Sequence, residues 1–95
     1  MLRVDSRRLH AGACELLVSG TLDVDQLPVM CHAVLESQEH GLAVTLNLSG
    51  LVGVDRAACQ TLVEWSVGGM RFVDCPPFLR RWIRDERRSR IRERP

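Results

Sequence analysis

Residues 43–69, AVTLNLSGLVGVDRAACQTLVEWSVGG, join a strand pattern to a helix pattern. Apolar side chains alternate along Ala43 to Leu48, which predicts a buried β-strand that ends at Ser49-Gly50. After Asp55 the apolar residues recur at helical spacing, at positions Ala58, Cys59, Leu62, Val63 and Ser66. Asp55 suits the helix N-cap, because a carboxylate accepts hydrogen bonds from free N–H groups of the first turn. This exposed helix N-terminus is a natural place for an interaction site or a phosphate switch.

The residues before this segment predict two strands and a helix. Leu2 to Asp5 is a short edge strand, Ser6 to Ala13 a turn, and Cys14 to Ser19 the antiparallel partner strand. Either Asp23 or Asp25 is the N-cap of the following helix, which has Pro28 in its first turn and stops at His40-Gly41. Its buried stripe comprises Leu27, Met30, Cys31, Val34 and Leu35.

The residues that follow the segment 43–69 predict one more strand and one more helix. The helix after Asp55 ends at Gly68-Gly69, and a fourth strand covers Met70 to Asp74. Pro77 opens a third helix. We expect one shared core, with members Val44, Leu46, Leu48, Leu62, Val63, Phe72, Leu79 and Ile83. The fold class is therefore α/β, a small mixed four-stranded sheet with helices packed on one face.

Length and charge suggest one domain with an arginine-rich end. The chain has 95 residues, with 13 arginines, no lysine and 12 acidic residues. Residues 1–83 form the expected domain and carry 7 arginines and 9 acidic residues, whereas residues 84–95 carry 6 arginines and 3 acidic residues. Residues 84–95 contain a single apolar side chain, Ile91, which fits either a solvated helical extension or a disordered tail.

Several classes of function lack their motifs. The four cysteines form no C-x-x-C pair and have no histidine at ligand spacing, so we expect reduced thiols and neither metal nor cofactor. There is no nucleotide-binding glycine motif and no recognisable catalytic triad, so we expect no enzyme. There is also no apolar run of about 18 residues and no apolar signal core, which predicts a cytoplasmic protein.

Three segments in a fixed order carry a family resemblance. They are Gly20 to Asp23, Asn47 to Asp55, and Gly69 to Val73 followed by Cys75-Pro-Pro-Phe-Leu. Together residues 14–83 resemble the STAS domain, named for sulfate transporters and anti-sigma-factor antagonists. The resemblance implies a STAS-like fold and a non-catalytic protein–protein interaction module in a sigma-factor or related bacterial signalling relay that regulates transcription.

The chain departs from that family at two places. Regulated antagonists carry Asp-Ser-Ser-Gly or Asp-Ser/Thr-x-Gly at the turn where this chain has Asp55-Arg56-Ala57-Ala58. A partner kinase phosphorylates the hydroxyl after the aspartate, and Arg56, at this degenerate phosphorylation position, has none. The family's last strand and helix also have no counterpart before the arginine-rich end.

Two of the candidate partner-binding positions, Asp23 and the Asp55 turn, lie at the expected carboxyl ends of strands. Asp23 and Asp55 serve either as turn and cap residues or as direct partner contacts. Arg56, Gln60 and Glu64 recur at helical spacing, and form either a solvated stripe or a partner-facing patch. The full candidate set is Asp23, Asp55, Arg56, Ala57, Gln60 and Glu64.

Three kinds of partner are candidates. The resemblance implies an anti-sigma-factor-like kinase, or alternatively a transporter ATPase, because soluble subunits of phospholipid-transport ABC assemblies also resemble this domain. The arginine-rich end could instead contact nucleic acid through phosphates, although a solvating tail also explains it. The open edge of the Met70 to Asp74 strand further predicts a homodimer through Phe72, Phe78 and Trp82, with Trp82 acting either as core packing or as an anchor.

Overall fold

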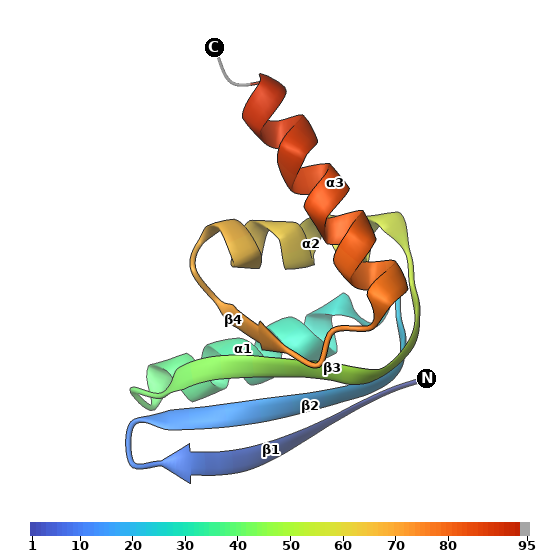
Figure 1. The fold of residues 1–95 in the computed structure, drawn as a ribbon. Helices are drawn as coiled ribbons and strands as arrows, with labels where there is room; N and C mark the ends of the chain where they lie inside the picture. The colour runs from blue at the N-terminus through green and yellow to red at the C-terminus, as the bar shows by residue number, and fades with distance from the viewer. Residues whose placement is uncertain (94–95) are drawn as a thin grey trace.

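The computed structural model describes residues 1–93, with the side chains of residues 1–89. These residues form a four-stranded sheet and three helices, whose arrangement is shown in Figure 1. The elements in chain order are β1 (Leu2–His10), β2 (Ala13–Leu22), α1 (Leu27–Glu39), β3 (Ala43–Val54), α2 (Arg56–Val67), β4 (Arg71–Val73) and α3 (Pro77–Glu93). The strands lie in the order β1-β2-β3-β4, with β1 antiparallel to β2 and the other pairs parallel. The expected α/β class with a small mixed sheet is confirmed.

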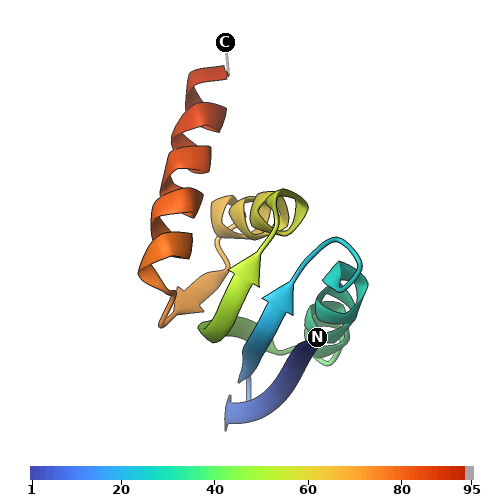
Figure 2. The same ribbon diagram turned by 90° about the vertical axis from the view of Figure 1, so that its right-hand side faces the viewer.

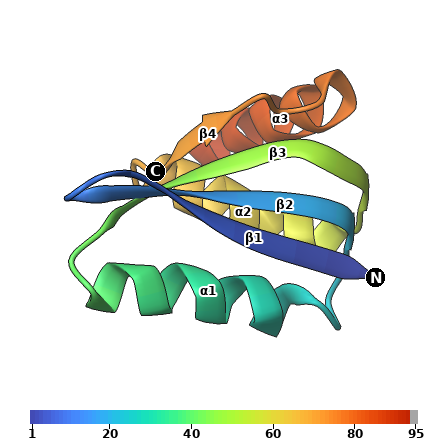
Figure 3. The ribbon, with the colours of Figure 1, turned by 90° about the horizontal axis from the view of Figure 1, so that it is seen from below.

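The three helices pack on the sheet at different places. Figure 2, which looks along the strands, shows α1 and α2 on one face and α3 rising beside β4, and Figure 3 shows α1 lying beneath β1 and β2. α3 packs mainly on α2, because its apolar side chains Leu79 and Ile83 join the cluster that α2 covers. The prediction that the helices share one face therefore holds for α1 and α2.

One core connects the sheet, α1, α2 and the start of α3. Leu46, Leu48, Leu62, Val63 and Leu79 are fully buried in it. Ile83 is a buried member, while Val44 and Phe72 are partly buried and pack against the cluster. The predicted core is confirmed.

Two predicted interruptions are wrong, because strand pairing continues through both. Residues 6–10 are part of β1 and pair with β2, leaving only Ala11-Gly12 as the turn. Ser49-Gly50 lies inside β3, which continues to Val54 with irregular pairing to β2. A Cβ on Gly50 would come within 2.5 Å of the Ser19 Cβ, so glycine here permits two strands to approach closely rather than ending one.

The helix ends also differ in detail from the sequence patterns. Gln26, rather than Asp23 or Asp25, occupies the N-cap of α1, and its side chain makes no capping hydrogen bond. The backbone of α3 is helical to Glu93, as the helical alternative for the arginine-rich end predicts. Residues 94–95 of that end lie outside the described residues.

Candidate functional site

Asp55 occupies the junction between β3 and α2. Its backbone is extended, with φ −86° and ψ 176°, so the chain leaves the strand and enters the helix at this residue. The Ala58 N–H donates to Asp55 Oδ1 at 2.8 Å. The predicted N-cap is confirmed, since this bond satisfies a donor that the first helical turn leaves free.

The second carboxylate oxygen of Asp55 reaches the loop between β2 and α1. The Val24 N–H donates to Asp55 Oδ2 at 2.9 Å, and the Asp55 N–H donates to the Leu22 carbonyl at 3.1 Å. One side chain therefore fastens two loops that are far apart in sequence. Both loops lie at the carboxyl ends of the adjacent parallel strands β2 and β3.

Asp23 shapes the loop that Asp55 holds. Its Oδ1 accepts hydrogen bonds from the N–H groups of Asp25 and Gln26, both at 3.0 Å. Its carboxylate is thus engaged by its own loop, and the structure places it as a turn-forming residue beside the Asp55 junction.

The outer surface of α2 continues from this junction. Arg56, Gln60 and Glu64 are exposed at successive turns of the helix, while Ala57 is partly buried and Ala58 is buried. The nearest helical hydroxyl, Thr61 Oγ1, donates to the Ala57 carbonyl at 3.2 Å. Apart from Asp23, all predicted partner-binding residues therefore belong to one continuous segment, residues 55–64, and the Asp23 loop is fastened to its first residue.

Two exposed valines beside the junction were missed by the sequence patterns. Val24, whose N–H binds Asp55, is 57 % exposed, and Val52, three residues before Asp55, is 79 % exposed. The preceding residue Leu51 is buried, so alternation turns Val52 away from the core. The exposure of Val52 could have been predicted if the alternation of buried and exposed residues had been continued past Ser49-Gly50. The break predicted there hid this alternation.

The residues predicted for self-association differ in accessibility. Phe72 and Trp82 are partly buried and pack against the core, whereas Phe78 is 46 % exposed. Packing explains Phe72 and Trp82 without a partner. A dimer surface on β4 and α3 remains a prediction, with Phe78 as its most accessible apolar side chain.

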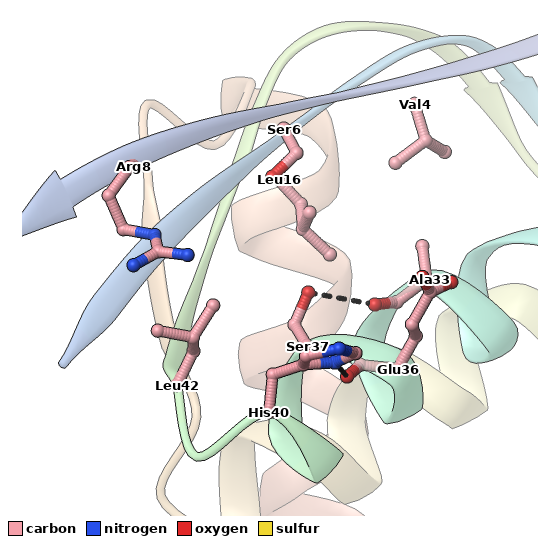
Figure 4. A pocket seen from close by; sticks show the side chains of 9 residues that line it. All are labelled: Val4, Ser6, Arg8, Leu16, Ala33, Glu36, Ser37, His40 and Leu42. Atoms are coloured by element: carbon pink, nitrogen blue, oxygen red, sulfur yellow. Dashed lines mark hydrogen bonds between the residues drawn. The ribbon is translucent and has the colours of Figure 1, made fainter. Parts of the chain in front are cut away.

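A groove of about 260 Å³ lies between β1 and α1 (Figure 4). Its apolar wall contains Val4, Leu16, Ala33 and Leu42, and polar side chains surround it. Two of these polar groups are already used by the α1 backbone. Ser37 Oγ donates to the Ala33 carbonyl at 3.0 Å, and His40 Nδ1 lies 2.8 Å from the Glu36 carbonyl.

A second groove, about 380 Å³ in volume, follows α3. It is lined by Ile83 and by arginines at helical spacing, Arg80, Arg84, Arg87 and Arg88. Arg80 donates to the Cys75 carbonyl at 3.1 Å and Arg87 to Ser66 Oγ at 3.0 Å, both of which are neutral acceptors. Within residues 1–89, no carboxylate forms an ion pair with these four guanidinium groups.

The thiols of Cys31, Cys59 and Cys75 lie in environments that favour the neutral form. Burial, together with the negative charge of Glu86 and the neighbouring Cys75, raises the pKa of Cys59 to about 11. Burial also raises the pKa of Cys31 and of Cys75, the latter against the opposing effect of Arg80. All four cysteines are free.

Within the described part of the chain, no group of three or more histidine, cysteine or acidic side chains is placed to hold a metal ion. Nor does any described helix have the length and apolar character needed to cross a membrane. In comparisons with known proteins, no family model matches the chain and no curated protein is significantly similar to it.

Proposed function

We propose that the protein is a non-catalytic, STAS-like interaction module whose partner docks on the Asp55 junction and the exposed side of α2. The observation that carries this proposal is the double hydrogen bonding of Asp55, to Ala58 and to Val24. These bonds join the β2–α1 loop to the start of α2, so that the two segments present one surface. A pre-organised surface loses less conformational freedom when a partner binds.

The chemistry of the exposed residues supports a protein partner. Arg56, Gln60 and Glu64 offer a cation, an amide and a carboxylate along one helix, and Val24 and Val52 add exposed apolar area nearby. Such a mixture of polar side chains around smaller apolar contacts is typical of protein interfaces. The family resemblance assigns the partner to the ATPase-fold proteins, as an anti-sigma-factor-like kinase or alternatively a transporter ATPase.

The interaction is constitutive in this proposal. Phosphorylation would bring about −1.5 to −2 charges to a serine after the aspartate, whereas Arg56 brings a fixed positive charge. The kinase could therefore bind this surface without being able to switch it.

Site-specific photocrosslinking in the native cell tests the surface. A benzophenone amino acid at Gln60 is expected to capture an ATPase-fold protein, and the same amino acid at Leu35, exposed on α1, serves as the control. The purified partner should bind the Arg56→Glu variant at least about tenfold more weakly, a loss of roughly 1.4 kcal/mol. Arg8→Glu should leave its affinity unchanged. Crosslinks from Leu35 alone, or equal binding by Arg56→Glu, would place the partner elsewhere.

The arginine groove of α3 supports a second candidate function, association with nucleic acid. Its four arginines lie on one side of the helix, and no described carboxylate forms an ion pair with them. Fluorescence anisotropy with duplex DNA and with single-stranded RNA tests this reading. Binding that weakens steeply with salt and is lost in Arg84→Gln/Arg88→Gln, but not in Arg3→Gln, would support it.

A further inference from the structure

The outer edge of β1 is the longest unpaired strand edge of the sheet. β1 has 9 residues and β4, at the opposite edge, has 3. Within residues 1–93, no strand pairs with the outer side of β1. An open edge of this length offers a row of backbone donors and acceptors to another strand.

The pairing with β2 shows which residues of β1 face outward. The Thr21 N–H donates to the Met1 carbonyl at 3.1 Å, and the register continues regularly from Leu2↔Gly20 to Arg8↔Cys14. Hydrogen-bonded pairs alternate along an antiparallel ladder, so the odd-numbered residues of β1 bond β2. The backbone groups of Leu2, Val4 and Ser6 consequently point to the free edge.

We propose that a second copy of this chain pairs antiparallel with β1 across a two-fold axis at Val4. In this register Val4 pairs with the second copy's Val4, and Leu2 pairs with its Ser6. All these residues have outward-pointing backbone groups, so the new ladder is complete. Arg3 then faces the second copy's Asp5, and Asp5 faces its Arg3. They form non-hydrogen-bonded pairs, where opposite side chains approach most closely.

The charged side chains of β1 favour this register over those with the two-fold axis at Asp5 or at Ser6. If the two-fold axis lay at Asp5 instead, the two Asp5 carboxylates would face each other and Arg3 would face the second copy's Arg7. Both of these like-charged pairs are repulsive. A further shift, centred on Ser6, would pair Asp5 with Arg7. Arg7 already forms an ion pair with Glu15 at 2.5 Å, and that register extends into the irregular pairing between Arg8 and His10. Arg3 and Asp5 are exposed, and among the side chains of residues 1–89 each forms an ion pair only with the other, at 2.9 Å.

Apolar surface at the same edge would be covered by the second copy. Leu2 and Val4 are only partly buried, and the groove between β1 and α1 is lined on one side by Val4. Val29 lies one helical turn before Ala33, on the same side of α1 as the groove, and is 50 % exposed. Pairing of two β1 strands brings these surfaces to the centre of an eight-stranded sheet and buries them.

Sedimentation equilibrium on charge-reversal variants tests the proposal. The wild-type chain should show a mass near twice 10.7 kDa at high micromolar concentration. Arg3→Asp alone and Asp5→Arg alone should each weaken dimerisation at least about tenfold, because both close pairs become repulsive. The double variant Arg3→Asp/Asp5→Arg should dimerise again. A mixture of the two single variants should form a heterodimer, since each supplies the charge that the other needs.

Arg71→Asp, the same reversal on β4, is the matched control and should leave the dimer intact. Circular dichroism of each variant establishes that it is folded. A monomeric wild type, or a dimer lost in Arg71→Asp but kept in Arg3→Asp, would overturn the proposal. A dimer lost in Asp5→Arg but kept in Arg3→Asp would overturn the Val4-centred register.

Discussion

At the scale of single residues, Asp55 has two structural tasks that one carboxylate performs together. Oδ1 caps α2 and Oδ2 holds the Val24 N–H of the preceding loop. A serine or asparagine could cap the helix, but neither offers two acceptor oxygens in this geometry. The choice of aspartate is thus explained by the second bond as much as by the first.

Removal of this carboxylate should cost stability. Asp55→Ala loses both bonds and is expected to lower the free energy of unfolding by about 1–2 kcal/mol, the upper part of the range for a helix cap. Asp55→Asn keeps one oxygen for the Ala58 N–H and should lose less. Urea denaturation followed by circular dichroism measures both variants, with the exposed Asp25→Ala as control. Equal midpoints for Asp55→Ala and wild type would contradict the prediction.

The Asp55 turn should also resist phosphorylation. Residues 55–58 contain no hydroxyl, and the Thr61 hydroxyl is partly buried and bound to the Ala57 carbonyl. We expect no phosphate after incubation with ATP and an anti-sigma-type kinase, as measured by intact mass spectrometry. Arg56→Ser creates the hydroxyl and is the comparison that shows whether the kinase recognises the turn. Phosphate on Thr61 or Ser49 of the wild type would mean that the switch had moved.

Cys59 gives the fold a defined response to alkaline pH. Its pKa rises from an ordinary 9.0 to about 11 in the folded chain, so the folded state retains this proton at a pH where the unfolded state releases it. The resulting stability is complete below pH 9.0 and is lost as the pH rises towards 11. Urea midpoints measured across this window should decline less steeply in Cys59→Ala than in wild type. Parallel declines would show that other groups dominate.

At the scale of elements, α3 is held by its first turns. Leu79 is fully buried and Ile83 nearly so, whereas Phe78, adjacent in sequence, is 46 % exposed. The helix therefore docks along a narrow apolar stripe on α2, and its arginines lie outside that stripe.

Alanine substitutions at Leu79 and Phe78 should lower the stability of the fold by different amounts, because Leu79 is buried and Phe78 is exposed. Leu79→Ala removes a buried side chain and is expected to cost about 2–5 kcal/mol, while Phe78→Ala should cost much less than Leu79→Ala. Chemical denaturation of the two variants at equal concentration makes the comparison. A larger loss for Phe78→Ala would indicate that Phe78 is covered in solution, as the dimer predicted from sequence on β4 and α3 requires.

At the scale of the whole molecule, a single cluster of buried side chains joins all the layers. It includes residues of β2, β3 and all three helices, and partly buried Trp65 and Trp82 pack against it from α2 and α3. A domain with one continuous core unfolds as one unit. The same continuity makes α3 part of the domain, because its Leu79 and Ile83 lie in the same cluster as buried residues of β2 and β3.

This continuity predicts coincident unfolding transitions. Fluorescence of Trp82→Phe, which reports on Trp65, and of Trp65→Phe, which reports on Trp82, should each follow the far-ultraviolet circular dichroism of the same variant in urea. An earlier transition for the Trp82 signal would show that α3 detaches before the sheet and α2 unfold.

Local patterns in the sequence determined the kinds and order of the elements. The alternation at Ala43 to Leu48 and the helical spacing after Asp55 each depend on residues within one element, and the N-cap of α2 depends on a residue three positions away. The predicted core members on β3, α2 and α3 followed from the same two periods, whereas Leu35, predicted in the buried stripe of α1, is 57 % exposed. The sequence also located the candidate surface at residues 55–64, because a cap after a buried strand marks a helix N-terminus at the edge of a sheet.

Contacts between distant residues decided the rest. Ser6 to His10 has the polar composition of a turn, yet pairing with β2 satisfies its backbone and makes it the end of a strand. Gly50 has the sequence character of a strand end, but in the structure it lies inside β3, where it leaves room for Ser19 of the neighbouring strand. The bond from Val24 to Asp55 spans 31 positions in the chain. No window of local sequence contains both partners of such contacts. Only the tertiary structure could therefore show that Asp55 joins two loops and that no strand within residues 1–93 pairs with the outer edge of β1.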